Sequence, residues 1–238
     1  MSKKISIIIP VLNESEGINN TVEHLNGLIT STNVSAEIIV VDGDPEGKTI
    51  TAIRDKNTIT TMGKTGRASQ MNKGAELATG KIFLFLHADT RLPDEGLNLI
   101  VVSCDGKTAK AGAFDLSIAS ERKVFRLIET MANFRSHMTK IPYGDQGLFF
   151  NADYFRALGG FADMPIMEDV EIMHRIKKRG DKIVFLQQAV QTSLRRWEKE
   201  GVWKCTLRNW SLMSLFVAGV NPQRLAKFYR VHEAGKTA

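Results

Sequence analysis

Two adjacent carboxylates, Glu168 and Asp169, begin the stretch PIMEDVEIMHRIKKRG, which spans residues 165–180. Apolar residues recur through it about every three positions, and basic residues crowd its end before a glycine, so the pattern predicts an amphipathic helix. Acids in the first turn and bases in the last turn stabilise a helix through its dipole. The pair is therefore either an ordinary first-turn pair or a carboxylate positioned as a general base.

Polar residues also follow three apolar runs that predict buried strands, at residues 4–11, 36–42 and 81–89. In an open α/β sheet, ligands bind just beyond the carboxyl ends of the strands. Asp42 would there hydrogen-bond a nucleobase or its ribose. Asp89 would ligate a divalent cation that bridges phosphate oxygens, because hard cations bind carboxylate and phosphate oxygens. For either acid alone, a strand-end turn or a helix cap is the competing interpretation.

The elements that must position these residues alternate between strand and helix. Helical periodicity is found between the runs, at residues 14–31, 67–80 and 94–103. This alternation predicts an α/β fold with a doubly wound, mostly parallel mixed sheet and helices on both faces. The later predicted elements are strands at 111–118, 144–152 and 181–186, a long helix at 121–138, and a helical, basic segment from Arg195 to Tyr229. With no repeat and no low-complexity linker, we expect one domain over residues 1–238.

The formal net charge of +6 favours anionic partners such as nucleotide phosphates or acidic lipid surfaces. No recognised nucleic-acid-binding motif accompanies the charge, so nucleic acid is not an expected partner. The chain has two cysteines, Cys104 and Cys205, without metal-ligand spacing, which fits a reducing cytoplasm. No apolar stretch approaches the roughly 20 residues that span a bilayer, so membrane contact would be peripheral, at the inner face.

Basic side chains concentrate towards the C-terminus and alternate with Trp197, Trp203, Trp210 and Phe216. This composition predicts either a membrane-surface patch for a lipid-linked acceptor or a solvated basic face with the aromatic residues packed inward. The helix at 121–138 carries an apolar set that we expect to face the core, with binding to a membrane as the alternative: Val124, Leu127, Met131, Phe134 and Met138.

Two common phosphate-binding motifs are missing. The stretch GKTGRASQ from Gly63 lacks the ending of a P-loop, and PVLNESEG after the first strand is not the glycine fingerprint of dinucleotide-binding proteins. PVLNESEG also lacks the glycine-rich loop with a lysine that a sugar-nucleotide pyrophosphorylase would carry.

Five motifs taken together are specific: SIIIPVLNE, IIVVDG, GRASQMNKGAELATGKIFLFLHADT, GGFADMPIMEDVEIMHRIKKRG and RRW. In this order and spacing, from about Ser6 to Trp197, the chain resembles family-two glycosyltransferases of the GT-A fold, above all the small single-domain bacterial members. The resemblance implies an inverting hexosyl transfer from a nucleotide-diphosphate sugar, UDP- or GDP-linked, to an acceptor hydroxyl whose identity is open. It also implies a nucleotide-binding half at about 1–110, an acceptor and catalytic half at about 111–197, and a basic helical segment at about 198–238.

The resemblance assigns residues to the donor nucleotide and to a metal. The donor-nucleotide residues it implies are Pro10, Asn13, Glu14, Asp42, Arg67, Asn72 and Ala88. Asp89 matches the last acid of the family's Asp-X-Asp motif, which holds Mn²⁺ or Mg²⁺ against the diphosphate. The first acid of that motif is His87 here, which either ligates the metal, with manganese suiting imidazole better than magnesium, or contacts the nucleotide instead.

The resemblance also assigns the acceptor side of the site. Asp169 matches the catalytic base, and Glu168 positions the loop or the acceptor. Arg196 and Trp197 match a pair that binds acceptor or diphosphate in some members. Ser193 stands where processive polymerases of the family carry glutamine, which argues against a polysaccharide synthase. The departure at His87 leaves a nucleotide-binding pseudoenzyme as the alternative to an active transferase.

Overall fold

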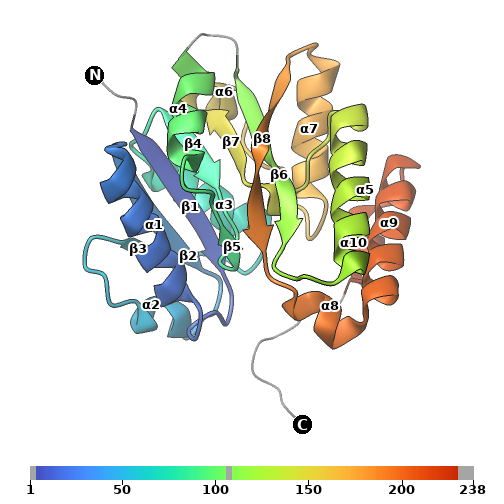
Figure 1. The fold of residues 1–238 in the computed structure, drawn as a ribbon, viewed down its shortest axis with the longest axis horizontal. Helices are drawn as coiled ribbons and strands as arrows, with labels where there is room; N and C mark the ends of the chain where they lie inside the picture. Colours follow the sequence, from blue (N-terminus) through green and yellow to red (C-terminus); the bar gives the residue numbers. More distant parts are fainter. Residues whose placement is uncertain (1–3, 106–108, 230–238) are drawn as a thin grey trace.

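The computed structural model describes residues 4–105 and 109–229 (Figure 1). The strands of these residues form one sheet of eight, in the order β3-β2-β1-β4-β7-β6-β8-β5. Their bounds are β1 Ile5–Val11, β2 Ala36–Asp42, β3 Ile59–Met62, β4 Ile82–Phe85, β5 Thr90–Arg91, β6 Ala111–Ile118, β7 Leu148–Asn151 and β8 Ile183–Thr192. The pairs β3-β2, β2-β1, β1-β4 and β6-β8 are parallel. The pairs β4-β7, β7-β6 and β8-β5 are antiparallel. The expected mostly parallel mixed sheet is confirmed.

Helices cover both faces of this sheet (Figure 1). α1 Ile18–Thr32 and α4 Gly96–Asp105 pack into the apolar core on one face, and α3 Arg67–Leu77, α6 Ala152–Ala157 and α7 Glu168–Lys178 into the core on the other. The remaining helical elements are α2 Lys48–Ala52, α5 Lys123–Thr139, the 3₁₀ turn η1 Gly144–Gln146, α8 Arg195–Glu200, α9 Val202–Val217 and α10 Pro222–Ala226.

The central strand β1 shows why the sequence there is a continuous apolar run. Side chains alternate across a strand, so Ile7 and Ile9 enter the core beside α1 and α4, whereas Ile8 enters the core beside α3. All three side chains are fully buried. Burying each one stabilises the fold by about 1.5–3 kcal/mol, which fixes the strand whose carboxyl end carries Pro10.

Helix α3 approaches β1 closely at Gly74, where an added Cβ would lie 2.4 Å from Cγ2 of Ile8. We expect Gly74→Ala to lower the free energy of unfolding by about 1–3 kcal/mol, because the extra methyl overpacks this contact. Gly27 on α1 is the matched control, since nothing lies within 4 Å of its added Cβ. Gly27→Ala should raise the free energy of unfolding by about 0.5–1 kcal/mol. Urea denaturation measures both, and two changes of the same sign would contradict the close approach.

Three later elements differ from the expected ranges. The strand expected at 181–186 is β8, which begins at Ile183 and continues to Thr192. The strand expected at 144–152 begins only at Leu148, because residues 144–146 form the η1 turn and Gly147 follows in a left-handed conformation, with φ of 60°. The helical segment from Arg195 to Tyr229 comprises α8, α9 and α10, which are separated at Gly201 and Gly219; both of these glycines also have positive φ.

The expectation that the apolar set of α5 faces the core is wrong for four of its five members. Leu127, Met131, Phe134 and Met138 are exposed, and Val124 alone is half-buried. The helix instead turns a different face inward, with Phe125 and Ile128 in a small core and the buried polar side chains of Glu129 and Ser136 hydrogen-bonded to β6 and η1. Tertiary hydrogen bonds, which periodicity does not report, decide which face is buried.

The C-terminal aromatic residues divide between the two expected arrangements. Trp197 and Phe216 pack inward, whereas the side chains of Trp203 and Trp210 are exposed. Inward packing is therefore wrong for two of the four. In the part of the chain that the structure describes, no helix has both the length and the hydropathy to cross a membrane.

Candidate active site

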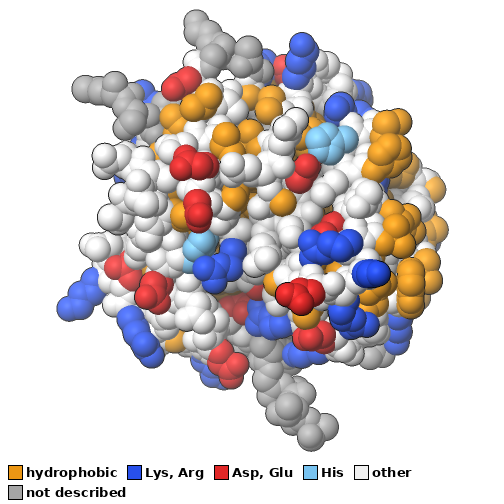
Figure 2. All heavy atoms as spheres, in the orientation of Figure 1, with side chains coloured by type: hydrophobic (Ala, Val, Ile, Leu, Met, Phe, Trp, Pro, Cys, Tyr) orange, Lys and Arg blue, Asp and Glu red, His pale blue; other side chains and the backbone are white. Residues whose placement is uncertain are grey.

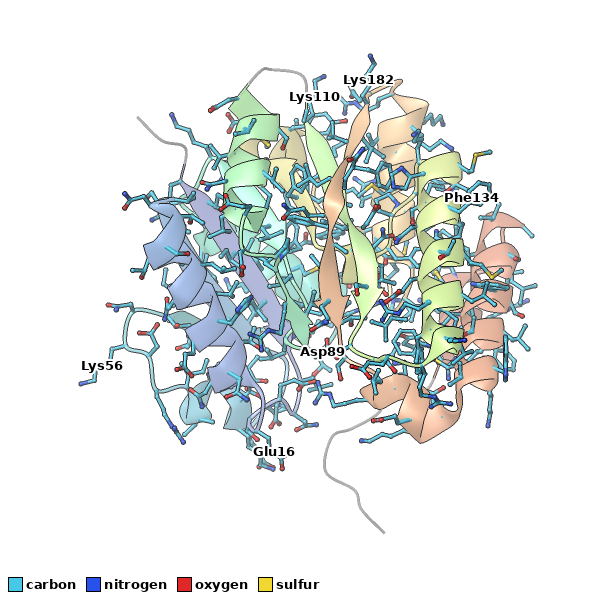
Figure 3. All side chains as sticks on the ribbon, viewed as in Figure 1. Glu16, Lys56, Asp89, Lys110, Phe134 and Lys182 are labelled. Atoms are coloured by element: carbon cyan, nitrogen blue, oxygen red, sulfur yellow. The ribbon has the colours of Figure 1, made fainter. Side chains whose placement is uncertain are left out.

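A cavity of about 380 Å³ opens where β1, β4 and β8 end and where α3 and α7 begin. Because β7 lies antiparallel to β4, its amino end and the η1 turn before it reach the same edge of the sheet. Asp89 lies at this edge, below the ends of the central strands in Figure 3. The predicted site residues that line the cavity are Pro10, Glu14, Arg67, His87, Ala88, Asp89, Asp169, Arg196 and Trp197.

Asp169 is held in one orientation at the start of α7. Its Oδ2 accepts a hydrogen bond from the Gly144 N–H at 2.7 Å, and its Oδ1 accepts one from the Val170 N–H at 2.8 Å. The residue before the pair, Met167, has a left-handed backbone with φ of 68°, a strained conformation for a side chain of this size. The turn at Met167 and the Gly144 N–H together direct the carboxylate of Asp169 to the cavity wall.

Glu168 points away from the cavity lining and pairs with Arg67. Its side chain is 2% exposed, and its Oε1 lies 3.0 Å from Nε of Arg67. Among the described residues, its Oε2 has no hydrogen-bond partner. Burial raises the pKa of Glu168, while the positive charge of Arg67 opposes that rise. The pair ties the first turn of α7 to the first turn of α3.

His87 occupies the wall between these groups. Burial, and then the positive charge of Arg67, lower the pKa of His87 to about 4. The imidazole is therefore neutral at physiological pH and keeps a lone pair for a cation or a hydrogen bond. A Cβ added at Gly144 would lie 3.3 Å from Nε2 of His87 and 3.3 Å from Oδ2 of Asp169. Gly144 thus leaves open the space between His87 and Asp169.

Asp89 and Glu14, at the ends of β4 and β1, share one arginine. Nη2 of Arg195 lies 3.0 Å from Oε2 of Glu14 and 3.5 Å from Oδ2 of Asp89. Burial raises the pKa of Glu14, and Arg195 offsets part of that effect. Arg195 thereby links the C-terminal segment to the ends of β1 and β4, where the sequence predicts that the donor binds.

Asp89 and His87 are the side chains of this edge that the sequence predicts as metal ligands. Within residues 4–105 and 109–229, no group of three His, Cys, Asp or Glu side chains is arranged to hold a metal ion by itself. Magnesium beside nucleotides usually takes one or two carboxylates and completes its shell with phosphate oxygens and water. Asp89 with His87 fits a cation that arrives with a diphosphate, and does not fit a preformed metal centre.

Three of the predicted donor residues, Asn13, Asp42 and Asn72, do not line the cavity. Asp42 is fully buried, and its carboxylate accepts hydrogen bonds from the N–H groups of Asp44, Thr49 and Ile50. Asn72 exchanges two hydrogen bonds with the backbone of Phe161, at 2.8 and 2.9 Å. Asn13 has a left-handed backbone with φ of 57° in the turn after β1. Asp42 thus ends β2, Asn72 lies on α3, and Asn13 lies in the turn after β1.

Arg196 and Trp197 close the cavity from the C-terminal side. The guanidinium of Arg196 donates to the Tyr229 hydroxyl and lies 4.9 Å from the centre of that ring. Trp197 packs edge-on against Phe125 with ring centres 5.8 Å apart. Its Nε1 is buried and has no hydrogen-bond partner in the described part of the chain.

Two cavity residues were missed by the sequence analysis, Tyr143 and Asp145 of the η1 turn. The Arg135 guanidinium lies 3.5 Å from the centre of the Tyr143 ring, and burial raises the pKa of Tyr143 to about 12. Burial, and then the negative charge of Asp169, raise the pKa of Asp145 to about 6. In the sequence, Asp145 is an acid between two glycines, just before an apolar run. The pattern predicts a strand over this whole stretch, at residues 144–152.

A third missed residue, Gln70, holds the cavity floor together. Its Nε2 donates to the backbone carbonyls of Val11 and Val41, at 2.7 and 2.8 Å, and its Oε1 accepts from the Gly66 N–H. One buried amide therefore ties the start of α3 to the ends of β1 and β2.

Asp145 should make the ligand-free protein less stable as the pH rises. Since its pKa rises from 3.8 to about 6 on folding, the fold favours the protonated form. That contribution is full below about pH 4 and is lost as the pH passes about 6. We expect Asp145→Asn to raise the free energy of unfolding at pH 7 by about 1–3 kcal/mol. Because the side chain is partly solvated, the gain should lie towards the lower end of this range.

Urea denaturation of Asp145→Asn at pH 4 and pH 7 checks this prediction. The matched control is Asp153→Asn, whose side chain is 95% exposed and which should change the free energy of unfolding by no more than about 0.5 kcal/mol. An equal gain for Asp145→Asn at both pH values would show that the charge of Asp145 is not its cause.

The fold and the cavity define the class of protein. A mannosyltransferase from Pyrobaculum calidifontis, solved with GDP-Man and Mn²⁺, superposes with a TM-score of 0.60 at 19% identity, over 81% of this chain and 57% of that one. S. aureus TarS 1–349 gives a TM-score of 0.59 at 16% identity, over 80% and 60% of the two chains. The catalytic domain of Drosophila β1,4-galactosyltransferase 7 gives 0.51 at 14% identity, over 77% and 64%. The fold is therefore that of the GT-A glycosyltransferases.

The family follows from the sequence profile described as Glycosyl transferase family 2, which matches residues 6–158. The chain belongs to this family. It spans about three fifths of the length of the solved structures it resembles. No curated protein sequence matches it significantly.

Proposed function

We propose that this chain performs an inverting transfer of a hexosyl group from a UDP- or GDP-linked donor to an acceptor hydroxyl. The observation that carries the proposal is the placement of Asp169, held by the Gly144 N–H at 2.7 Å on the wall of the cavity that Asp89 and Arg196 also line. Inverting transfer is one displacement, which needs a base beside the acceptor and positive charge beside the departing diphosphate. The cavity has residue types suited to both needs.

In this proposal Asp169 takes the acceptor's proton as the acceptor oxygen bonds to the anomeric carbon. The bond from that carbon to the phosphate oxygen breaks on the opposite face, and the nucleoside diphosphate leaves with the electron pair. General-base assistance of this kind is worth about 10²–10⁴ in rate. The two N–H groups that hold the carboxylate keep one geometry for proton transfer, which is the role we assign to Gly144 and Val170.

The diphosphate side rests on Asp89, His87 and the basic residues of α8. Asp89, with His87, would hold the divalent cation, which when bound neutralises charge on the leaving diphosphate. A neutral His87 suits manganese better than magnesium, and contact with the nucleotide is its alternative role. Arg196 and Arg195 add positive charge at the same wall. Glu168, paired with Arg67, would position Asp169 without touching substrate.

The similar solved structures support the class of donor. One was solved with GDP-Man and Mn²⁺, one with UDP, and one with manganese, UDP-Gal and xylobiose. At 14–19% identity these structures do not select a base for this chain. The donor base is therefore the first property to measure.

A thermal-shift panel of UDP, GDP, CDP, dTDP and ADP, each with and without manganese, tests the proposal. A ligand at 100 times its Kd stabilises by about 2.7 kcal/mol, which should raise Tm by roughly 5–10 °C in a chain of this size. A metal-dependent shift for one diphosphate would name the donor base. Binding without release of diphosphate from any donor sugar would favour the pseudoenzyme alternative, and no shift with any nucleotide would overturn both.

A further inference from the structure

The exposed side of α5 carries an apolar stripe. Leu127, Met131, Phe134 and Met138 follow one another at intervals of four, three and four residues, which places them in one line along the helix. Their exposed fractions are 52%, 40%, 67% and 68%. Phe134 projects outward from α5 in Figure 3. A stripe of four large apolar side chains in water is costly unless something covers it.

Helix α9 carries a second stripe on its outer side. Trp203, Leu207, Trp210 and Val217 fall on one face, again at helical spacing, and are 60%, 56%, 36% and 57% exposed. The other side of the same helix faces the molecule, and its Asn209 lines the cavity. A single helix therefore has one face at the candidate active site and another, apolar face in solvent.

The two stripes belong to one surface. The start of α5 meets α8 and the first residue of α9, where Phe125 and Ile128 pack with Trp197 and Val202. In Figure 1, α5 and α9 lie along the same edge of the molecule. In Figure 2, hydrophobic side chains gather along that edge. We call the eight exposed residues of the two stripes the apolar edge.

Positive charge surrounds the apolar edge. Residues 195–229 contain seven basic and two acidic residues, so this segment carries +5 of the chain's formal +6. Lys204 and Lys199 are exposed beside the α9 stripe, and Lys123 and Lys140 are exposed at the two ends of α5. Arg195 and Arg196 of this segment lie at the cavity and Arg208 pairs with Glu200, so the positive charge that flanks the apolar edge is that of the exposed lysines.

We propose that the apolar edge docks on an anionic membrane surface. Tryptophan, phenylalanine and leucine on one helical face with flanking lysine and arginine is the composition of helices that lie in the lipid headgroup region. Anionic lipids attract each nearby basic residue, whereas a second copy of the chain would bring the same positive charges against each other. Charge complementarity thus favours lipid over self-association.

This docking would determine the class of acceptor, an inference that rests on the proposed transferase function. With α9 in the headgroup region, its inner face still contributes Asn209 to the cavity. An acceptor hydroxyl displayed at the membrane surface would then lie near the cavity, whereas the nucleotide-sugar would enter from water. The acceptor we infer is a hydroxyl-bearing lipid or a lipid-linked saccharide.

Vesicle co-sedimentation tests the docking without nucleotide or acceptor. The chain should bind phosphatidylcholine vesicles with about one third phosphatidylglycerol, bind pure phosphatidylcholine weakly, and lose most binding at about 0.5 M salt. Phe134→Glu and Trp203→Glu should each reduce binding at least about tenfold, because each puts a charge into the headgroup region. Val102→Glu on α4, 71% exposed and outside the apolar edge, is the matched control and should bind as the parent chain does.

Three results would overturn the docking proposal: no binding to either vesicle, equal losses in the Val102→Glu control, or a dimer seen by light scattering that the same two variants dissociate. The nucleotide thermal shift is measured in parallel on every variant and should stay at its parental value. If the parent chain binds neither vesicle but keeps its nucleotide shift, the docking alone is rejected. Vesicle binding in a chain that binds no nucleotide rejects the transferase proposal and leaves the docking in place.

Discussion

Asp169→Asn should lower kcat by about 10²–10⁴ while leaving the metal-dependent nucleotide shift in place. The amide cannot take the acceptor's proton, yet it keeps an oxygen that can accept the Gly144 N–H, now 2.7 Å from Oδ2 of Asp169. The substitution therefore removes the chemistry with little change in shape. The measurement is release of nucleoside diphosphate with the donor that the nucleotide panel identifies, together with the Tm of the variant with and without nucleotide.

The matched control for this prediction is Asp163→Asn, whose side chain is 77% exposed in the loop before α7. It should transfer sugar at the parental rate. If Asp169→Asn keeps more than about a tenth of the parental kcat, the base is another group. Asp145, partly buried on the same wall with a pKa raised to about 6, would be the next candidate to test.

Asp89→Ala should abolish the part of the nucleotide thermal shift that depends on manganese. A metal held by phosphate oxygens and one or two protein ligands loses its main protein anchor when the carboxylate is removed. The same change also frees Arg195, which lies 3.5 Å from Asp89 and 3.0 Å from Glu14. We therefore expect the metal-dependent rise in Tm of roughly 5–10 °C to vanish, and transfer to fall with it.

Asp94→Ala, an exposed acid between β5 and α4, is the matched control and should keep the full shift. A separate binding measurement follows Mn²⁺ by electron paramagnetic resonance, with and without nucleoside diphosphate. The structure describes no three-ligand metal site in residues 4–105 and 109–229, so free protein should bind manganese weakly and the diphosphate should strengthen that binding. Strong binding to free protein would contradict a cation that arrives with the nucleotide.

Much of the fold was predictable because its strands are buried on both faces. A strand covered by helices on each side is apolar at every position, so residues of β1 and β4 stand out as continuous runs. Parallel strands place their carboxyl ends at one edge, which is why His87, Asp89 and Glu14 were expected together and are found together in the cavity lining.

The same rule explains why Asp145 was missed. It precedes a strand, and a residue at the amino end of a parallel strand would lie at the opposite edge of the sheet. β7 is antiparallel to β4, so its amino end meets the carboxyl ends of β1 and β4. Strand direction depends on pairing between distant segments, and no local pattern of residues reports it.

Asp42 shows a second limit of predicting a site from the sequence. An acid at a strand end was compatible with a ligand contact or with a turn, and these differ only in where nearby N–H groups lie. In the structure three backbone N–H groups, of Asp44, Thr49 and Ile50, donate to this carboxylate. Whether Asp42 also takes part in nucleotide binding stays a prediction.

The sequence by itself determined the α/β class, the strands, and the set of motifs that marks the glycosyltransferase family. Only the tertiary structure decided which side chains of those motifs reach the cavity and which face of α5 meets the core. Helical periodicity aligns Leu127, Met131, Phe134 and Met138, but it cannot say what lies opposite them. Glu129 and Ser136 hydrogen-bond to β6 and η1, and these contacts between distant segments turn the apolar stripe outward.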